Sequence, residues 1–395
     1  MAVENWVAKH VDDLVAFRRD LHRNPELLYD LPRTSAEVAR LLREAGVDEV
    51  HEGIGRTGVV AIIRGQSNRS GRMIGLRADM DALPIVEATG AEWASTVAGK
   101  MHACGHDGHT AMLLGAARGL VESRAFDGAV ALIFQPAEEG GAGARAMIED
   151  GLFTRFPISE VYGMHNKPGV PVGSFATCAG PLMGSVDEIN IRIEGKGGHA
   201  AVPQNTIDPV PVMAALVQAA QSIVSRNLDP MKSAVLSITQ ITAGDAFNVI
   251  PQAVTLRGTV RTLDEEVRDM VEARLTQATH HIAEAYGATG TLDYQRHYPV
   301  TINAEVGVER VAEAARAIAG EAQVDTNLTP GLGGEDFSFM LNEKPGAIIF
   351  LGNGASANLH HPMYDFNDEI IPWGCSFWTT LVRQRLPLGQ GGAQG

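Results

Sequence analysis

Hydrophobic positions in the N-terminal third of the chain follow two different spacings. Residues 34–45 repeat apolar side chains at helical intervals, and residues 110–123, rich in Ala and Leu, also predict a helix. Short apolar runs at residues 73–76 and 130–134 end in polar residues and predict strands. Strands that alternate with helices indicate a mostly parallel sheet covered by helices on both faces.

The spacing changes from about residue 185. Ile189, Ile191 and Ile193 alternate with polar residues, which predicts a strand with one solvent-facing side. The elements predicted to follow it are helix 209–224, strand 234–241, strand 253–260, helix 263–286 and strand 289–294. The order strand, helix, strand, strand, helix, strand is that of the split βαβ (ferredoxin-like) unit, an α+β sandwich.

Long helices and apolar strands such as residues 347–351 return after about residue 298. We therefore predict an α/β protein in which a larger domain, residues 1–184 and 298–395, is interrupted by a smaller α+β domain, residues 185–297. A chain of 395 residues is long enough for two such domains. The Gly-rich tail, residues 389–395, is predicted to be disordered.

Composition and charge exclude several classes of protein. The formal net charge of -15 gives no electrostatic footprint for nucleic acid or an anionic membrane. No apolar run reaches the roughly 18 residues that span a bilayer, and Met1–Phe17 predicts an amphipathic helix rather than a signal peptide. The few cysteines argue against a disulfide framework and for a reducing, cytoplasmic location.

Residues that bind metals or protons follow four short apolar runs, at residues 73–76, 130–134, 161–164 and 347–351. These residues are Asp79 and Asp81, Glu138 and Glu139, His165, and the pair His360 and His361. The carboxyl ends of parallel strands meet at one edge of an open α/β sheet, where ligands bind. We therefore expect these side chains to gather at one site.

The loop of residues 102–109 adds histidines, a cysteine and an aspartate to this set. Gly105 and Gly108 are expected to keep the loop tight and to prevent a helix from passing through it. Cys104 and His106 could reach one ion, or two neighbouring ions, from such a turn. A redox-active thiol or a set of buried histidines is the alternative, but the density of ligand types favours a metal site.

Glu138 and Glu139 are adjacent acids at the end of a hydrophobic strand. Burying two carboxylates together is costly unless a positive charge lies between them, and a metal ion supplies that charge. One acid could then bind metal while the other holds a water. Two solvated turn acids are one alternative. A dinucleotide loop at residues 140–143 is another, but both acids would repel a pyrophosphate there.

The predicted smaller domain also carries candidate site residues. His199 lies in a Gly-rich turn, and Asn248 and Arg261 lie beside predicted strands. From the residue pattern alone, His199 is as consistent with a structural role as with a catalytic one. The other two could be turn and surface residues.

Short motifs spread over nearly the whole chain carry a resemblance to a known family. They run in that family's order at residues 18–22, 25–26, 77–84, 101–109, 134–139, 164–166, 195–199, 246–251, 334–337 and 359–362. On these motifs the chain resembles the M20 family of metallopeptidases. It looks like the amidohydrolase branch, which holds hippurate hydrolases, N-acyl-amino-acid amidohydrolases and plant auxin-conjugate hydrolases.

The resemblance implies roles for the matching residues of the larger domain. The implied ligands of a two-metal centre (Zn, Mn, Co or Ni) are Cys104, His106, Glu139, His165 and His360. Cys104 would bridge the two ions, Glu138 would be the general acid/base, and Asp81 would orient a ligand.

The resemblance also assigns roles to the smaller domain. His199 would stabilise the developing oxyanion, in related enzymes often from the partner subunit. Asn248 and Arg261 would help to hold the substrate, including its carboxylate. The domain would act as a lid and as the surface through which a homodimer or homotetramer forms.

Two departures from the family pattern affect the ligand set. Much of the wider family has His-x-Asp where this chain has Asp-Met-Asp at residues 79–81, so His106 would replace a missing ligand. The branch usually has His-Ser-Pro or His-Asn-Pro where this chain has His-His-Pro at residues 360–362. Position in the motif favours His360 as the ligand, with His361 as the competing candidate.

We predict a metal-dependent enzyme that hydrolyses the amide bond of small N-acyl amino acids, such as hippurate-like conjugates. The two ions would activate a water and polarise the carbonyl, and Glu138 would act on that water as general base. A dipeptidase or aminopeptidase on the same scaffold is the alternative. The chain lacks the Pro-Cys-x-x-Cys of a zinc deaminase, and its complete ligand set disfavours a non-catalytic binding protein.

Overall fold

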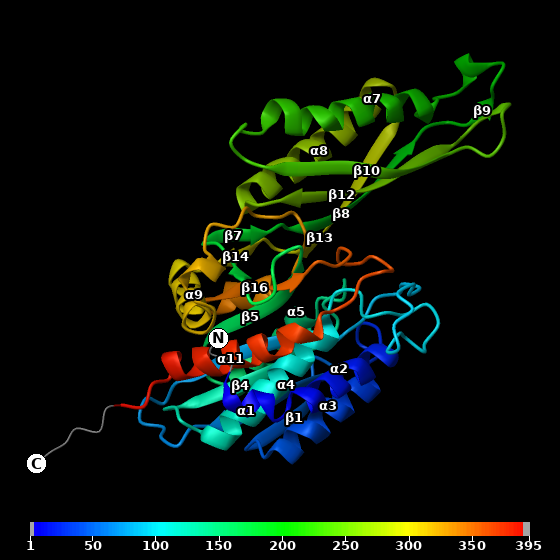
Figure 1. Cartoon of the computed structure of the whole chain (residues 1–395). Helices are drawn as coiled ribbons and strands as arrows, with labels where there is room; N and C mark the ends of the chain where they lie inside the picture. The colour runs from blue at the N-terminus through cyan, green and yellow to red at the C-terminus, as the bar shows by residue number, and fades with distance from the viewer. Residues whose placement is uncertain (1–3, 390–395) are drawn as a thin grey trace, which may run out of the picture. The chain divides into compact units, whose positions relative to one another are not determined.

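The computed structural model describes residues 4–389, which fold into two compact units (Figure 1). Unit 1 comprises residues 1–180, 302–329 and 336–395, and unit 2 comprises residues 181–301 and 330–335. The domain boundaries predicted after residues 184 and 297 stay predictions. Within the described residues, no helix is both long and apolar enough to cross a membrane.

The centre of unit 1 is a mixed sheet in the order β1-β2-β4-β3-β5-β16-β6-β15. Its strands are β1 (Glu49–Ile54), β2 (Gly58–Arg64), β3 (Met73–Asp79), β4 (Ala129–Gln135), β5 (Ile158–Pro168), β6 (Phe175–Ala176), β15 (Val324–Asp325) and β16 (Gly346–Gly354). The central strands β4, β3, β5 and β16 run parallel to one another. β4 is buried along its whole length, which explains its continuous apolar run. The predicted α/β class with a mostly parallel sheet is confirmed.

Helices cover the sheet of unit 1. They are α1 (Asn5–Ala8), α2 (Val11–Arg23), α3 (Pro32–Ala45), α4 (His106–Ser123), α5 (Gly143–Glu149), α6 (Leu152–Arg155), α9 (Glu305–Ala319), α10 (Ser338–Glu343) and α11 (Ile371–Arg385), with short 3-10 helices at Glu321–Gln323 and Asp368–Ile370. α4 is almost completely buried and packs against α2, α3 and α11. Its close approach to α11 requires Gly115, because a Cβ there would lie 2.4 Å from the Sγ atom of Cys375.

Two helix predictions in unit 1 differ from the structure. The N-terminal amphipathic stretch forms two helices, α1 and α2, and residues 1–3 of that stretch lie outside the described range. The expectation that Gly108 keeps a helix out of its loop is wrong, because α4 begins at His106 and contains Gly108. The ring of Phe366 fills the place of the missing side chain, with ring atoms 2.1 Å from where a Cβ would lie. Tertiary packing therefore accounts for this glycine. Residues 390–395 of the predicted disordered tail also lie outside the description.

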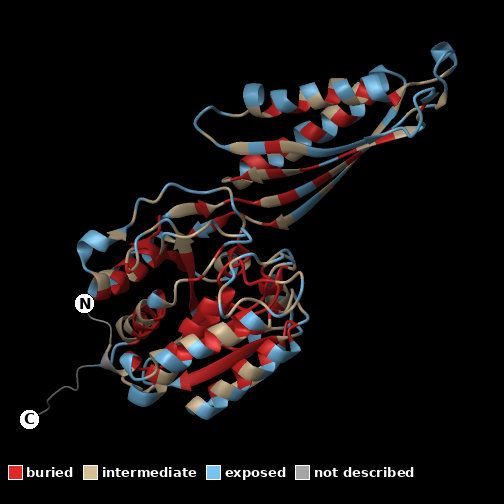
Figure 2. Cartoon of the chain, turned by 45° about the vertical axis from the view of Figure 1, so that its right-hand side comes forward, coloured by how far each residue is buried: buried red, intermediate tan, exposed pale blue. Residues whose placement is uncertain are grey.

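Unit 2 contains an antiparallel sheet in the order β10-β12-β8-β13. Its elements in chain order are β8 (Val186–Glu194), α7 (Pro209–Ser222), β10 (Ala234–Ala243), β12 (Ala253–Thr262), α8 (Glu265–Ala285) and β13 (Thr289–Tyr298). This is the element order of a split βαβ unit. The isoleucines of β8 that alternate in the sequence, Ile189, Ile191 and Ile193, are fully buried in the core of the unit. Figure 2 shows the same alternation of buried and exposed positions along the strands.

Shorter elements complete the chain. They are β7 (Gly180–Met183), β9 (Gly198–His199), a 3-10 helix at Pro203–Asn205, a π-helical turn at Ile223–Asn227 that continues α7, β11 (Val249–Ile250) and β14 (Thr301–Asn303). β9 and β11 pair in an antiparallel, two-stranded ribbon that carries two of the predicted site residues.

Candidate metal centre

The carboxyl ends of four parallel strands meet at one edge of the sheet of unit 1. β3 ends at Asp79, β4 leads into the turn that carries Glu138, and β5 carries His165 near its end. β16 leads into the loop that carries His360. Because β4, β3, β5 and β16 are neighbours in the sheet, these segments deliver their polar side chains to the same place.

The N-terminus of α4 supplies the remaining candidate ligands. Gly105 adopts a left-handed conformation, with φ at 92°, directly before the helix. A Cβ at this position would lie 2.5 Å from the side-chain oxygen of Asn166, so the turn requires glycine. This turn places Cys104 and His106 on the two sides of Gly105, both of them buried.

The structure brings together all five residues predicted as metal ligands. Cys104, His106 and His165 form one group, and Cys104, Glu139 and His360 form a second group. Within each group the potential ligand atoms lie within 4.8 Å of one another. The two groups share Cys104, and His106 also lies near Glu138 and Glu139 in a further group, so the five residues form one continuous cluster that would hold a pair of ions.

Hydrogen bonds fix the orientation of the two buried imidazole rings. His106 directs Nδ1 to the backbone carbonyl oxygen of Asp81 at 2.9 Å, and His165 directs Nδ1 to that of Asn166 at 2.7 Å. The Nε2 atom of each ring therefore faces the cluster, and that of His165 lies 3.4 Å from the Sγ atom of Cys104. Metal-binding histidines are commonly oriented in this way through their other nitrogen.

Two buried atoms of the cluster lack a hydrogen-bond partner among the described residues. They are Nε2 of His106 and Oε1 of Glu139. A buried polar atom without a partner is costly, and a cation between these groups would remove that cost. The donor set of a thiol, imidazoles and a carboxylate suits Zn²⁺, Mn²⁺, Co²⁺ or Ni²⁺. The residues present therefore fit a pair of divalent ions.

The pKa values of the two buried histidines shift in opposite directions. Burial disfavours the charged form of both rings. For His106, the carboxylates of Asp79, Asp81 and Glu139 outweigh burial and raise the pKa to about 10. For His165, burial and the neighbouring histidines lower the pKa well below its usual range. The surroundings of His106 thus carry a surplus of negative charge that a cation can neutralise.

Asp81 holds the turn that carries the two glutamates. Its carboxylate accepts hydrogen bonds from the backbone N–H groups of Glu138 at 2.9 Å and Glu139 at 3.1 Å. Ala137, directly before them, has a left-handed backbone with φ at 53°, which is unfavourable for a residue with a side chain. The two hydrogen bonds that Asp81 accepts therefore stabilise a strained turn. This arrangement supports the orienting role that the resemblance implied for Asp81.

The sequence motif favoured His360 as the ligand and kept His361 as a competing candidate. Nε2 of His360 lies 3.3 Å from Oε1 of Glu139, whereas Nδ1 of His361 accepts a hydrogen bond from the backbone N–H of Met363. His360 has a left-handed backbone, with φ at 64°, and a half-exposed side chain. Position in the fold therefore favours His360.

A buried polar network surrounds these residues, and the sequence assigned no individual role to its members Arg77, His109, Asn166 and Asp336. Arg77 pairs with Asp79 at 2.8 Å and with Asp336 at 3.0 Å. The backbone N–H of Asp336 points to Oε1 of Glu138 at 3.4 Å. His109 joins Asp79 at 2.6 Å and the Asn166 side chain at 2.8 Å. All of these residues lie in the motifs that carry the resemblance, and for Arg77, Asn166 and Asp336 those motifs were the only signal.

The other three predicted site residues belong to unit 2. His199 and Asn248 are exposed and lie close together, because β9 pairs with β11 and the Ala200 N–H donates to the Asn248 carbonyl oxygen at 3.1 Å. Arg261 is half-buried on β12, where it pairs with Val235 and not with the ribbon. The structure thus brings together two of the three.

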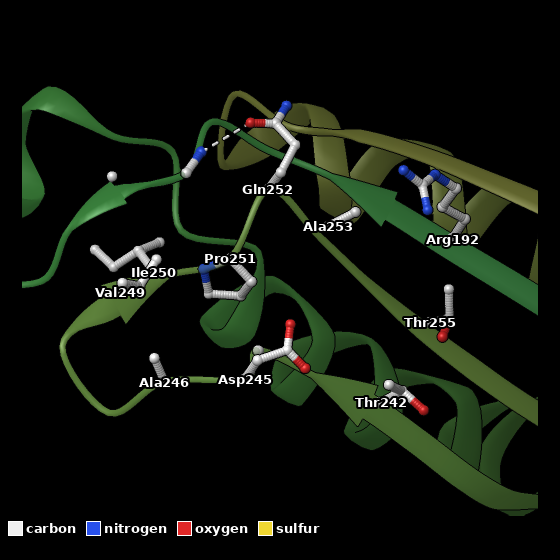
Figure 3. A pocket seen from close by; sticks show the side chains of 13 residues that line it. Arg192, Thr242, Asp245, Ala246, Val249, Ile250, Pro251, Gln252, Ala253 and Thr255 are labelled. Carbon is white, nitrogen blue, oxygen red and sulfur yellow. Dashed lines mark hydrogen bonds between the residues drawn. The ribbon is translucent and has the colours of Figure 1, made fainter.

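The ribbon of unit 2 borders a hollow of about 610 Å³. Figure 3 shows Val249, Ile250 and Pro251 on one side of it and Arg192 and Thr255 on the other. His199, Asn248 and Arg261 do not line this hollow, so it provides no support for their predicted roles.

Comparisons with known proteins identify the same family as the sequence motifs. Residues 75–384 match the family described as peptidase family M20/M25/M40. A hippurate hydrolase of Campylobacter jejuni is 42% identical over 369 residues, which cover 93% of this chain and 95% of that protein. An N-acetylcysteine deacetylase of Bacillus subtilis is 40% identical over 370 residues, covering 93% and 96%. The crystal structure of a Bacillus subtilis protein, described as a dinuclear metal binding peptidase, matches with a TM-score of 0.84 and 35% identity over 95% of this chain and 98% of that one.

Proposed function

This chain belongs to peptidase family M20/M25/M40 and is a metal-dependent amidohydrolase, and from that premise we propose that its substrates are N-acyl amino acids. The observation that carries the proposal is the convergence of the five candidate ligands into two groups that share Cys104. Glu138 lies beside these groups on the same turn as Glu139, and its side chain is almost completely buried.

We assign the ligand roles from this geometry. Cys104 would bridge two divalent ions, with His106 and His165 completing one site and Glu139 and His360 the other. When bound, the two ions would lower the pKa of the attacking water and polarise the scissile carbonyl.

Glu138 is the proposed general base. It would accept the proton that the attacking water loses and deliver it to the leaving nitrogen. The Asp81 carboxylate and the Asp336 N–H hold the turn and the carboxylate of Glu138 in place. Such preorganisation matters because a proton acceptor must lie within hydrogen-bond reach of the water.

The substrate class is inferred from the similar proteins. Hippurate and N-acetylcysteine, named for the two relatives, both carry an acyl group on the nitrogen of an amino acid. His199, Asn248 and Arg261 belong to unit 2, and their roles in oxyanion and substrate binding stay predictions. The same holds for a homodimer or homotetramer formed through that unit.

A substrate panel tests the proposed function. We expect the metal-loaded protein to hydrolyse N-benzoylglycine and N-acetyl amino acids faster than dipeptides with a free α-amine. Thorough chelation should abolish turnover, and Zn²⁺, Mn²⁺, Co²⁺ or Ni²⁺ should restore it. Undiminished hydrolysis after chelation would contradict the proposal, and a requirement for the free α-amine would identify a dipeptidase or aminopeptidase instead.

A further inference from the structure

Lys167 places a positive charge beside the candidate metal centre. It lies near the end of β5, two residues after His165, so both side chains project from the same face of the strand. The side chain is half-buried. Lys167 therefore lies beside the candidate ligand His165, closer to the carboxyl end of β5.

An aromatic ring links Lys167 to the metal centre. The ammonium of Lys167 lies 4.6 Å from the centroid of the Phe350 ring. Phe350 pairs with His165 across β5 and β16, and the two ring centroids are 6.2 Å apart. The Phe350 ring is almost completely buried, so it gives Lys167 a fixed support. The ammonium is thus separated from a candidate ligand by one aromatic ring.

The charge of Lys167 is not neutralised within the described part of the chain. No hydrogen bond or ion pair there involves its ammonium. The buried arginines of unit 1 differ, since Arg18 pairs with Asp107 and Arg77 pairs with Asp79 and Asp336. A partly desolvated ammonium without an anionic partner favours the binding of an anion from outside.

We propose that Lys167 binds the carboxylate of the substrate. The inference rests on the proposed function, because the free carboxylate is the one group that every N-acyl amino acid carries in ionised form. Lys167 would then hold, on unit 1 itself, the carboxylate that the resemblance assigns to Asn248 and Arg261 of unit 2. Lysine suits this task as a flexible point charge that can follow side chains of different size.

A second lysine of unit 1 provides a matched control. Lys344 is also half-buried and lies over an aromatic ring, 5.3 Å from the centroid of Phe153. It follows α10 and is not adjacent in sequence to any candidate ligand. The comparison of K167M with K344M therefore separates the position beside the metal centre from the lysine–aromatic contact itself.

Paired substrates test the proposal. For N-benzoylglycine, we expect K167M to lower kcat/KM about 10- to 100-fold, mainly through KM, because a hydrogen bond to a charged group is lost. For N-benzoylglycinamide, which lacks the negative charge, K167M should change kcat/KM by less than about threefold. K344M should leave kcat/KM unchanged for both substrates. An equal loss on both substrates, or no loss on N-benzoylglycine, would overturn the proposal.

A binding measurement separates this inference from the proposed function. Calorimetry in the E138Q background compares the affinity for N-benzoylglycine with and without K167M, at equal metal content. Weaker binding in the double variant supports Lys167 even where turnover is absent, whereas equal affinity, or no binding to either protein, overturns its role. Failure of the wild-type protein to cleave any N-acyl amino acid would instead refute the proposed function.

Discussion

In unit 1 most candidate site residues are buried, whereas in unit 2 His199 and Asn248 lie on or beside an exposed ribbon. The side chain of His106 is fully buried and that of Glu139 is 9% exposed. His199 and Asn248 are exposed, and the imidazole of His199 accepts a hydrogen bond from the N–H of Ala201, two residues away.

This difference has a physical consequence. Several buried side chains of unit 1 bond to residues from distant segments, as His109 does to Asn166 and Asp81 to Glu138, so the site is preorganised but depends on the whole fold. Each strand of the ribbon in unit 2 is two residues long, and His199 and Val249 on it are exposed, so these two side chains can change without disturbing a core. Substitution of a buried ligand in unit 1 should therefore affect metal binding and folding as well as chemistry, whereas substitution of an exposed ribbon residue should leave folding unchanged.

The largest effect is expected for E138Q in unit 1. Loss of the general base should lower kcat by roughly 10²- to 10⁴-fold, while both ions remain bound. Steady-state kinetics and metal analysis measure the two outcomes. E139Q serves as the contrast, since it should lose metal as well as activity. Near-normal turnover by metal-loaded E138Q would exclude Glu138 as the base.

H199A tests the exposed site residues of unit 2. If His199 stabilises the oxyanion, kcat should fall by about 10²-fold. Because the side chain is exposed, the free energy of unfolding should change by less than about 0.5 kcal/mol. The neighbouring exposed residue Val249 offers the control V249A, with kcat expected to be unchanged. Normal turnover by H199A would favour the structural interpretation of this histidine.

A third prediction concerns stability at the opposite ends of the strands of unit 1. Glu160 lies near the beginning of β5 and pairs with Arg72, Arg310 and Arg385. Its carboxylate is nearly buried, but the arginines are partly exposed, so E160Q should lower the free energy of unfolding by about 1–3 kcal/mol. Denaturant unfolding measures this change.

E149Q provides the control for E160Q. Glu149 and Arg145 form an exposed pair at 4.0 Å on α5, so its loss should change the unfolding free energy by less than about 0.5 kcal/mol. Equal effects of the two substitutions would show that the Glu160 cluster is no more stabilising than a surface pair.

The smallest expected effect is a pH dependence of stability at His22. Burial opposes protonation of this ring, but hydrogen bonds to Asp107 and Glu87 raise its pKa from 6.5 to about 9. The raised pKa means that the folded state holds the proton more tightly than the unfolded state. The stabilisation is therefore complete below pH 6.5 and is lost as the pH rises through about 9.

H22Q measures that contribution. The difference in unfolding free energy between wild type and H22Q should be on the order of 1–2 kcal/mol at pH 6 and smaller at pH 10. Urea unfolding at both pH values tests the sign. A difference that is independent of pH would mean that His22 stabilises the fold through packing alone.

Much of the fold could be predicted because its signals are local. The continuous apolar run of β4 and the alternating isoleucines of β8 each identified a strand and its burial. Gly108 was misjudged because its role depends on the ring of Phe366, which comes from a distant part of the chain. The hydrophobic pattern contains no information about such a contact.

The candidate site divides in the same way. Ligand-type side chains at strand ends indicated Glu139, His165 and His360, and the family motifs added their roles. The polar contacts of Arg77 and Asp336 could not be predicted individually, because the two residues are 259 positions apart and meet only after the sheet forms. Lys167 likewise gave no sequence signal, since its meaning comes from the neighbouring ring of Phe350.

The sequence by itself determined the kinds of element and the kinds of ligand, because periodicity and residue chemistry are properties of short segments. Tertiary structure alone decided the order of the strands, in which β3 lies between β4 and β5. In the folded sheet Cys104 belongs to both ligand groups. Hydrogen bonds to backbone carbonyl oxygens fix the orientation of the His106 and His165 rings. The physical reason is that these contacts join residues far apart in the chain, and only the packed sheet brings them within bonding distance.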